Sequence, residues 1–225
     1  MNTVGITRTL ERLGGRNLAH LTPRYIFDRC LVAFDQLRRP ADPWLTRPAI
    51  SILESWLRPD DVGFEWGSGR STVWFARRVR RLVSIEHDPA WYETVRERLA
   101  RAGLLDRCDC RLEPDGRDET PNSRYVRAVE EVLDNTLDFA LVDGVARVHC
   151  ALAVLSKLRP GGLLCIDNAN WFLPGPAPSR SPNSRNEHGP ANASWAELAE
   201  QLRSWRCIWT SNGVFDTAFW VKSAA

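Results

Sequence analysis

The sequence predicts a three-layer α/β fold around a seven-stranded, mostly parallel sheet whose last strand is antiparallel. Two observations indicate this fold class. From residue 61 onward, short apolar runs alternate with longer segments of helical periodicity, as βαβ units require. The end of the chain carries two β-like runs around Asn212-Gly213, a dipeptide typical of tight hairpin turns. A parallel sheet closed by an antiparallel hairpin accounts for both patterns.

The strands and helices can be placed in order from this alternation. We expect strands at 62–66, 82–86, 108–112, 139–143 and 163–167, followed by the terminal hairpin. We expect helices at 71–79, 89–102, 123–133, 147–158 and 194–204. Right-handed crossovers between parallel strands would place these helices against the sheet. Residues 173–194 are rich in Pro, Ser, Asn and Gly and predict a long loop that could cover a site.

Residues 1–45 differ from this pattern. Their apolar residues recur at mixed helical spacing with arginines between them, which predicts two helices joined near Thr22-Pro23. The run 38–43 contains two prolines and indicates a boundary. We therefore expect an N-terminal helical extension over 1–45 and one domain over 46–225. The domain would begin with a short helix capped by Thr46.

Composition restricts the partners and the compartment. The chain has 225 residues and a net charge of +2. A net charge this small gives no electrostatic reason to expect a nucleic acid or an anionic membrane as a binding partner. Arginines at 77, 78, 80 and 81 lie at a predicted helix end, where we expect them to face solvent. None of the six cysteines forms a C-x-x-C pair, no apolar run approaches 18 residues, and residues 1–21 do not resemble a signal peptide. We expect a cytoplasmic protein without a membrane span, and a homodimer is compatible with the sequence.

The stretch FEWGSGRS at 64–71 contains a glycine turn after the first strand. Gly67, Ser68 and Gly69 would lie at the carboxyl end of that strand, where ligands bind in parallel sheets. Glycine permits positive φ and leaves room for a ligand, and Ser71 and Thr72 would open the next helix with free amides. A dinucleotide fingerprint requires a third glycine where Thr72 stands. This difference weakens a nicotinamide-dependent oxidoreductase as the function.

Acidic residues beside the turn restrict the class of ligand further. Glu65 stands two residues before Gly67, just ahead of the turn, and would repel a pyrophosphate but attract a cation. Glu86 ends the second strand, 19 residues after Gly67, a position that suits ribose hydroxyls. His87 follows it and would lie near the adenine edge. A nucleoside with a cationic side arm fits these residues, and S-adenosylmethionine is such a molecule.

The same segments resemble a known family. FEWGSGRSTVWFA, LVSIEHDPAWYETVRERL, DFALVDGVAR and LRPGGLLCIDNANW are similar to class I S-adenosylmethionine-dependent methyltransferases, and the resemblance covers about residues 45–225. It implies a Rossmann-like fold and methylation of a small-molecule acceptor, with oxygen the expected acceptor atom. The residues expected to bind the methyl donor are Glu65, Gly67, Ser68, Gly69, Ser71, Thr72, Glu86, His87 and Asp143. A non-catalytic protein that retains this fold as a scaffold is the remaining alternative.

Two later strands also end in polar residues. Asp143 ends the fourth strand, and Asp167 and Asn168 end the fifth. Oxygen ligands of this kind suit Mg²⁺, which could lower the pKa of an acceptor hydroxyl. The arrangement is similar to metal-dependent O-methyltransferases of catechols and caffeoyl esters, whose metal ligands these three residues match. Alternatively, the acids bind loop amides, or Asp143 positions an acceptor without a metal.

The catalytic residues are less clearly indicated. The metal-dependent enzymes carry a lysine three positions after the first aspartate, whereas Ala146 stands there and Arg147 follows. Arginine is a poor base, but Arg147 could clamp an acidic substrate or stabilise a developing anion. We therefore expect Asp143 and Arg147 to be the catalytic residues. Trp171 follows the fifth strand and could line the acceptor pocket.

Overall fold

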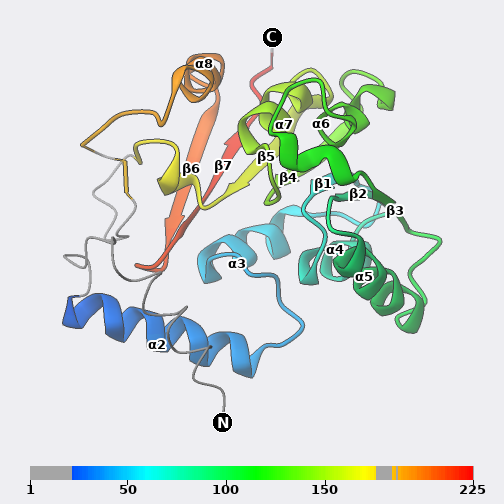
Figure 1. Cartoon of the computed structure of the whole chain (residues 1–225), viewed down its shortest axis with the longest axis horizontal. Coiled ribbons are helices and arrows are strands. Elements are labelled where there is room, and N and C mark those ends of the chain that lie inside the picture. The colour runs from blue at the N-terminus through cyan, green and yellow to red at the C-terminus, as the bar shows by residue number, and fades with distance from the viewer. Residues whose placement is uncertain (1–21, 176–183, 186, 225) are drawn as a thin grey trace.

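The computed structural model of the chain describes residues 22–175, 184–185 and 187–224 (Figure 1). Its strands form one sheet in the order β3-β2-β1-β4-β5-β7-β6. The strands are β1 (Val62–Trp66), β2 (Arg81–Glu86), β3 (Cys108–Leu112), β4 (Leu137–Val142), β5 (Leu158–Asp167), β6 (Arg206–Ser211) and β7 (Asp216–Val221). Strands β1 to β5 pair in parallel, and β7 runs antiparallel to both β5 and β6. The predicted fold class is confirmed.

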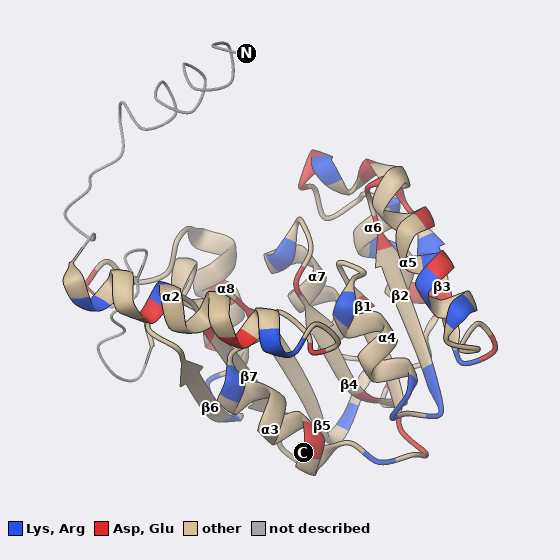
Figure 2. Ribbon diagram, turned by 90° about the horizontal axis from the view of Figure 1, so that it is seen from below, with Lys and Arg blue, Asp and Glu red and all other residues tan. Residues whose placement is uncertain are grey.

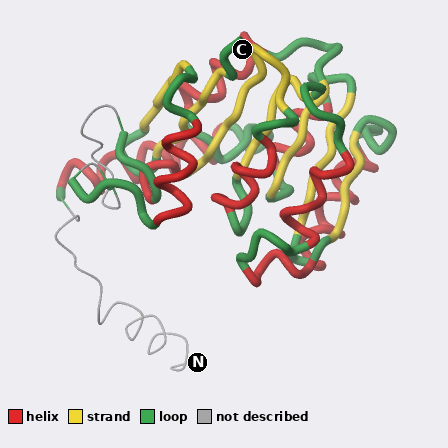
Figure 3. The backbone as a smooth tube through the Cα atoms, turned by 90° about the horizontal axis from the view of Figure 1, so that it is seen from above, coloured by secondary structure: helices red, strands yellow, loops and turns green. Residues whose placement is uncertain are grey.

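Helices cover both faces of the sheet (Figure 3). The α-helices are α2 (Pro23–Arg38), α3 (Arg47–Trp56), α4 (Arg70–Ala76), α5 (Pro89–Arg101), α6 (Arg124–Arg127), α7 (Arg147–Val154) and α8 (Ala193–Gln201). Short 3-10 helices are η2 (Pro114–Asp118), η3 (Ala128–Glu131) and η4 (Ala169–Trp171). Helices α3, α4 and α5 contribute to one hydrophobic cluster, and α6, α7 and α8 contribute to the other. Each described helix is too short or too polar to span a bilayer.

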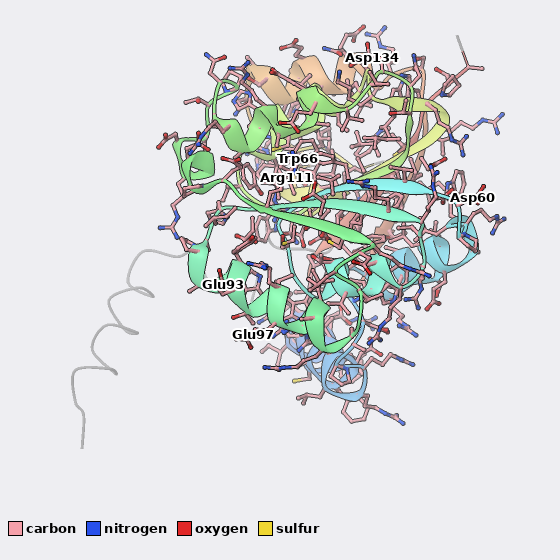
Figure 4. All side chains as sticks on the ribbon, turned by 90° about the vertical axis from the view of Figure 1, so that its right-hand side faces the viewer. Asp60, Trp66, Glu93, Glu97, Arg111 and Asp134 are labelled. Atoms are coloured by element: carbon pink, nitrogen blue, oxygen red, sulfur yellow. The ribbon has the colours of Figure 1, made fainter. Side chains whose placement is uncertain are left out.

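Strand β1 is packed on both of its faces, and residues 63–66 are all buried, Glu65 included. Phe64 and Trp66 are fully buried in the cluster beneath α6 and α7, and the indole of Trp66 donates to the Tyr125 carbonyl at 2.8 Å. On the opposite face, the ring of Phe139 fills the space that a side chain at Gly63 would need. Burial on both faces leaves no polar alternation. In Figure 4, Trp66 lies inside the molecule, whereas Glu93 and Glu97 project outward from α5.

Some expected elements differ in the structure. The helix expected at 123–133 is divided into α6 and η3, and β5 begins at Leu158 instead of 163. The turn-like residues of 159–162 lie within β5, where Gly161 has a φ of +79° and the register with β4 shifts. An irregular strand can therefore contain residues that the sequence pattern assigns to a turn.

The N-terminal segment is described from residue 22 onward. Thr22 caps α2 by accepting a hydrogen bond from the Tyr25 amide, as its position before Pro23 predicts. The buried Asp28 of α2 lies against Gly213 in the β6–β7 hairpin. The other helix expected in the extension lies outside the described residues, as does much of the 173–194 loop. The boundary at residue 45 stays a prediction.

Candidate functional site

The carboxyl ends of β1, β2 and β4 surround a cavity of about 680 Å³. We call it the donor cavity. Of the residues predicted to bind a methyl donor, seven line it, namely Gly67, Ser68, Gly69, Ser71, Glu86, His87 and Asp143. Glu65 and Thr72 are buried and do not line it. The fold therefore brings most of these residues to one cavity, although they come from three separate strand ends.

Gly67 is the residue that lets the β1 loop close over its neighbour. Its φ is +91°, and a Cβ there would lie 2.7 Å from the Gly144 amide nitrogen and 2.8 Å from the Asp143 carbonyl carbon. Its own amide donates to the Ile85 carbonyl at 2.9 Å. Only glycine satisfies both the backbone angle and this close approach. The turn is thereby held between β2 and the loop after β4.

Glu86 organises the other wall of the donor cavity. Its Oε2 accepts from the Ser68 amide at 3.0 Å, and its Oε1 accepts from the amides of His87 and Asp88 at 2.8 Å each. The side chain of Asp88 then caps α5 by accepting from the Trp91 amide. Three backbone N–H donors therefore fix the position of the Glu86 carboxylate. Glu86 thus presents a fixed negative group where β2 ends.

Glu65 acts on the turn from within the core. Its Oε2 accepts hydrogen bonds from the hydroxyls of Thr72 and Ser84 at 2.6 Å each, and the Thr72 hydroxyl accepts from the Gly69 amide. Burial raises the pKa of Glu65 to about 7, although the hydroxyls of Ser71, Ser84 and Thr72 oppose the shift. Its Oε1 is buried without a hydrogen-bond partner. Glu65 and Thr72 therefore shape the turn, and one acceptor atom of Glu65 remains unsatisfied.

Arg147 lies among the residues that were expected to bind a metal. Its Nη2 donates to the Asp143 carbonyl and to Asp143 Oδ1 at 3.0 Å each, and its Nε donates to the Gly144 carbonyl at 2.9 Å. Its Nη1 donates to the Asp167 carbonyl and to Asn168 Oδ1. These bonds occupy all five guanidinium N–H groups. Arg147 therefore joins the end of β4 to the end of β5 and has no donor left to clamp a substrate.

The carboxylate of Asp167 has another partner. Its Oδ1 accepts from the Thr217 hydroxyl of β7 at 2.6 Å, and the side chain is buried. Burial and the nearby Asp143 raise the pKa of Asp167, and burial also raises the pKa of Asp143 while Arg147 opposes it. In the described part of the chain, no three His, Cys, Asp or Glu side chains gather closely enough to hold a metal ion. Asp143, Asp167 and Asn168 thus surround a guanidinium.

Eight residues that line the donor cavity were not predicted from the sequence, and three of them have large aromatic or cationic side chains. Trp44 and Arg70 line it, with the Arg70 guanidinium 5.1 Å from the centre of the Trp44 ring. Trp91 also lines it, and its indole donates to the Ser68 carbonyl at 2.6 Å. Trp91 could have been found from its place three residues after the capping Asp88. Trp44 belongs to the stretch assigned to the extension, and no sequence signal linked it to the turn.

Trp171, expected to wall an acceptor pocket, lies in η4 beyond β5 and is 41% exposed. It contacts the ring of Phe172 edge-on and is not among the residues of the donor cavity. Its role at an acceptor stays a prediction.

Tyr125 is a further buried neighbour of the donor cavity, because its hydroxyl occupies the space that a Cβ at Gly144 would take.

Comparisons with known proteins agree with this architecture. Residues 64–169 match a family model described as a methyltransferase domain. The O-methyltransferase TomG from Streptomyces achromogenes is 19% identical with a TM-score of 0.59, covering 88% of this chain and 90% of that one. A methyltransferase from Geobacter sulfurreducens is 15% identical with a TM-score of 0.55, covering 97% of each chain. An rRNA methylase from Streptococcus thermophilus is 14% identical with a TM-score of 0.50, covering 80% of this chain and 98% of that one.

The search of curated proteins finds no match to this chain. The structural neighbours show the fold, since their sequence identities are low. The family match is more specific, because it begins at Phe64 in β1, ends in η4 and contains both the glycine turn and the loop after β4. The sheet around that region ends in the antiparallel β7. Residues 64–169 of this chain therefore match a methyltransferase domain, and the sheet that contains them has the strand arrangement of the class I S-adenosylmethionine-dependent methyltransferase fold.

Proposed function

We propose that the protein transfers the methyl group of S-adenosylmethionine to an oxygen atom of a small-molecule acceptor, and that it does so without a metal ion. The observation that carries the proposal is the polarity of the donor cavity. Three carboxylates line it, from Glu86, Asp88 and Asp143, and among the described residues Arg70 is the one arginine or lysine in the lining. Such a wall attracts a cationic ligand and repels a pyrophosphate.

The residues present fit the methyl donor. Gly67 lets the turn pack directly against the loop after β4, which brings both loops to the cavity. Glu86 offers a fixed carboxylate for ribose hydroxyls. The donor-binding residues of this proposal are those that line the cavity, with Glu65 and Thr72 holding the turn in shape.

S-adenosylmethionine supplies a methyl group on an activated sulfonium, so the protein has to orient the acceptor and remove its proton. Asp143 is suited to both tasks. Arg147 fixes its Oδ1, whereas its Oδ2 accepts no hydrogen bond from the described residues. Burial raises the pKa of Asp143, which makes the carboxylate a stronger base. Arg147 acts as a positioning residue, because its donors are all engaged within the protein.

The expected magnesium site does not fit this arrangement. A divalent cation between Asp143 and Asn168 would have to displace the Arg147 guanidinium, which already supplies a positive charge there. Asp167 also directs Oδ1 to Thr217. We therefore expect methyl transfer to proceed fully in excess chelator. Loss of turnover in chelator, restored by Mg²⁺, would contradict the metal-free proposal.

The small-molecule acceptor is supported by the O-methyltransferase TomG among the structural neighbours and by the net charge of only +2. Basic and acidic residues are interspersed along the ribbon (Figure 2). The rRNA methylase neighbour makes RNA the competing acceptor class. Calorimetry with S-adenosylmethionine, S-adenosylhomocysteine, NAD⁺ and NADP⁺ tests the donor, and formation of S-adenosylhomocysteine with phenols, hydroxy acids and RNA tests the acceptor. Turnover with a hydroxylated small molecule is expected.

The other outcomes each contradict one part of the proposal. Binding of NAD(P)⁺ without S-adenosylmethionine would replace it with an oxidoreductase. Tight binding of S-adenosylhomocysteine with no turnover on any acceptor would indicate a scaffold. Turnover with RNA and with none of the small molecules would show that the acceptor is a nucleic acid. Asp143→Asn should lower kcat by about 10²-fold or more while S-adenosylhomocysteine still binds.

A further inference from the structure

A second hollow of about 450 Å³ lies beside the donor cavity, between α4 and α5. We call it the arginine groove, after the four arginines that line it, namely Arg70, Arg77, Arg98 and Arg101. No aspartate or glutamate of the described residues lines it, and small apolar side chains such as Val73 and Ala102 complete the wall. The groove therefore concentrates positive charge on a protein whose net charge is only +2.

The positive charge of the groove is largely unbalanced. Arg101 pairs with the exposed Glu97 at 2.7 Å. Across the described residues, by contrast, Arg70, Arg77 and Arg98 form no ion pair. Four guanidinium groups around one hollow repel each other at short range. An anion bound among them would remove that repulsion.

Two of the arginines are also held in place while their donors stay free. The Arg70 guanidinium lies over the Trp44 ring, 5.1 Å from its centre, and the Arg98 guanidinium lies at the same distance from the centre of the Trp91 ring. A cation–π contact of this kind holds a guanidinium against the ring without using its N–H donors. The Nη1 atom of Arg70 is buried and has no hydrogen-bond partner. A buried, unpaired charged donor indicates that a ligand atom belongs beside it.

We propose that the arginine groove binds a small ligand with two or more phosphate charges, next to and separate from the methyl donor. Arginine edges match phosphate oxygens in pairs, and the volume suits a small molecule. Arg70 lines both the groove and the donor cavity, so the ligand would lie against the donor site. The proposal does not depend on which acceptor is methylated.

Calorimetric titration with pyrophosphate, in the presence of saturating S-adenosylhomocysteine, tests this site. The groove variant is Arg77→Gln with Arg101→Gln. The matched control is Arg80→Gln with Arg206→Gln, which removes the same charge at exposed arginines outside the groove. The groove variant should bind pyrophosphate at least about tenfold more weakly than the unmodified protein, since two charge-assisted contacts are lost. The pyrophosphate affinity of the control variant should change less than about twofold, and the affinity for S-adenosylhomocysteine should be unchanged in both variants.

Four outcomes would overturn the proposal. The first is an absence of pyrophosphate binding at millimolar concentration. Equal weakening in both double variants would show general attraction to a basic surface. Loss of pyrophosphate binding on saturation with S-adenosylhomocysteine would place the anion in the donor cavity at Arg70. A short RNA that binds more tightly than tripolyphosphate, and that both variants weaken, would indicate a nucleic-acid surface.

Discussion

At the scale of single residues, Gly67 shows how one backbone angle and one close contact define the donor cavity. Gly103 is also a glycine at positive φ, at +66°, but no atom lies within 4 Å of a Cβ built there. Substituting each glycine in turn therefore separates the conformational strain of a positive φ from the steric clash of a side chain. Only at Gly67 would a side chain push the β1 loop away from the β4 loop.

Gly67→Ala should reduce the affinity for S-adenosylhomocysteine by at least about tenfold, because about 1–2 kcal/mol of backbone strain is joined by a clash that moves the turn. Gly103→Ala should share the strain and keep the affinity. Calorimetric titration of both variants with S-adenosylhomocysteine measures the difference. Equal affinity of Gly67→Ala and the unmodified protein would show that the contact with Gly144 does not shape the site.

Glu65 gives a residue-scale prediction on pH. Its pKa is raised from 4.5 to about 7 in the folded protein, so the folded state holds a proton that the unfolded state releases between these values. This group's contribution to stability is fully present below pH 4.5 and is lost as the pH rises through about 7. The loss is on the order of 3 kcal/mol.

Glu65→Gln removes this proton equilibrium. Urea unfolding of the ligand-free protein at pH 5 and at pH 7.5 should show that the variant gains stability relative to the unmodified protein as the pH rises. The comparison at each pH cancels the titration of all other groups. A stability difference that does not change with pH would mean that Glu65 has an ordinary pKa.

At the scale of elements, Arg147 connects the ends of β4 and β5 through the first turn of α7. It begins α7 directly after Ala146, which has a φ of +49°, and its guanidinium reaches both strand ends. Asn168, with a φ of +53°, turns its amide oxygen back toward the same guanidinium. The two loops are thus shaped around one cation.

Arg147→Lys should destabilise the protein by at least about 2 kcal/mol, because an ammonium cannot reach the five acceptors that the planar fork satisfies. Urea unfolding measures this change. Arg127→Lys is the matched control, since Arg127 is exposed and pairs only with Glu130, and it should have little effect. Similar stability of the two variants would mean that Arg147 does not join the strand ends.

At the scale of the whole molecule, a buried chain of hydroxyls connects segments that lie more than 100 residues apart in the sequence. The Thr46 hydroxyl, which caps α3, lies 2.5 Å from the Thr210 hydroxyl of β6. The Thr217 hydroxyl accepts from the Thr46 amide and donates to Asp167 at 2.6 Å. The start of α3, the terminal hairpin and the end of β5 therefore share one polar network.

Thr217→Val should lower the free energy of unfolding by about 1–3 kcal/mol, because it leaves buried polar groups of Asp167 and Thr46 unpaired. Thr136→Val is the control, since the exposed Thr136 hydroxyl donates only to the nearby Leu133 carbonyl. Urea unfolding of the two variants measures the difference. An equally small effect in both would show that the hydroxyl network does not stabilise the fold.

The sequence by itself determined the fold class and the region of the donor site. Strand runs, the glycine turn and Glu86 at the end of β2 are local patterns, and parallel strands bring their carboxyl ends to one edge by geometry alone. This is why residues from separate strands, such as Ser68, Glu86 and Asp143, could be predicted to meet, and they line one cavity.

The tertiary structure decided what each of these residues touches. A strand-end aspartate looks the same in sequence whether it faces a metal, an arginine or a hydroxyl, and only packing placed Arg147 beside Asp143 and Thr217 beside Asp167. Trp44 reached the donor cavity, and four arginines gathered between α4 and α5, through contacts between distant segments. Such contacts depend on side-chain direction and on neighbours far along the chain, which no local pattern records.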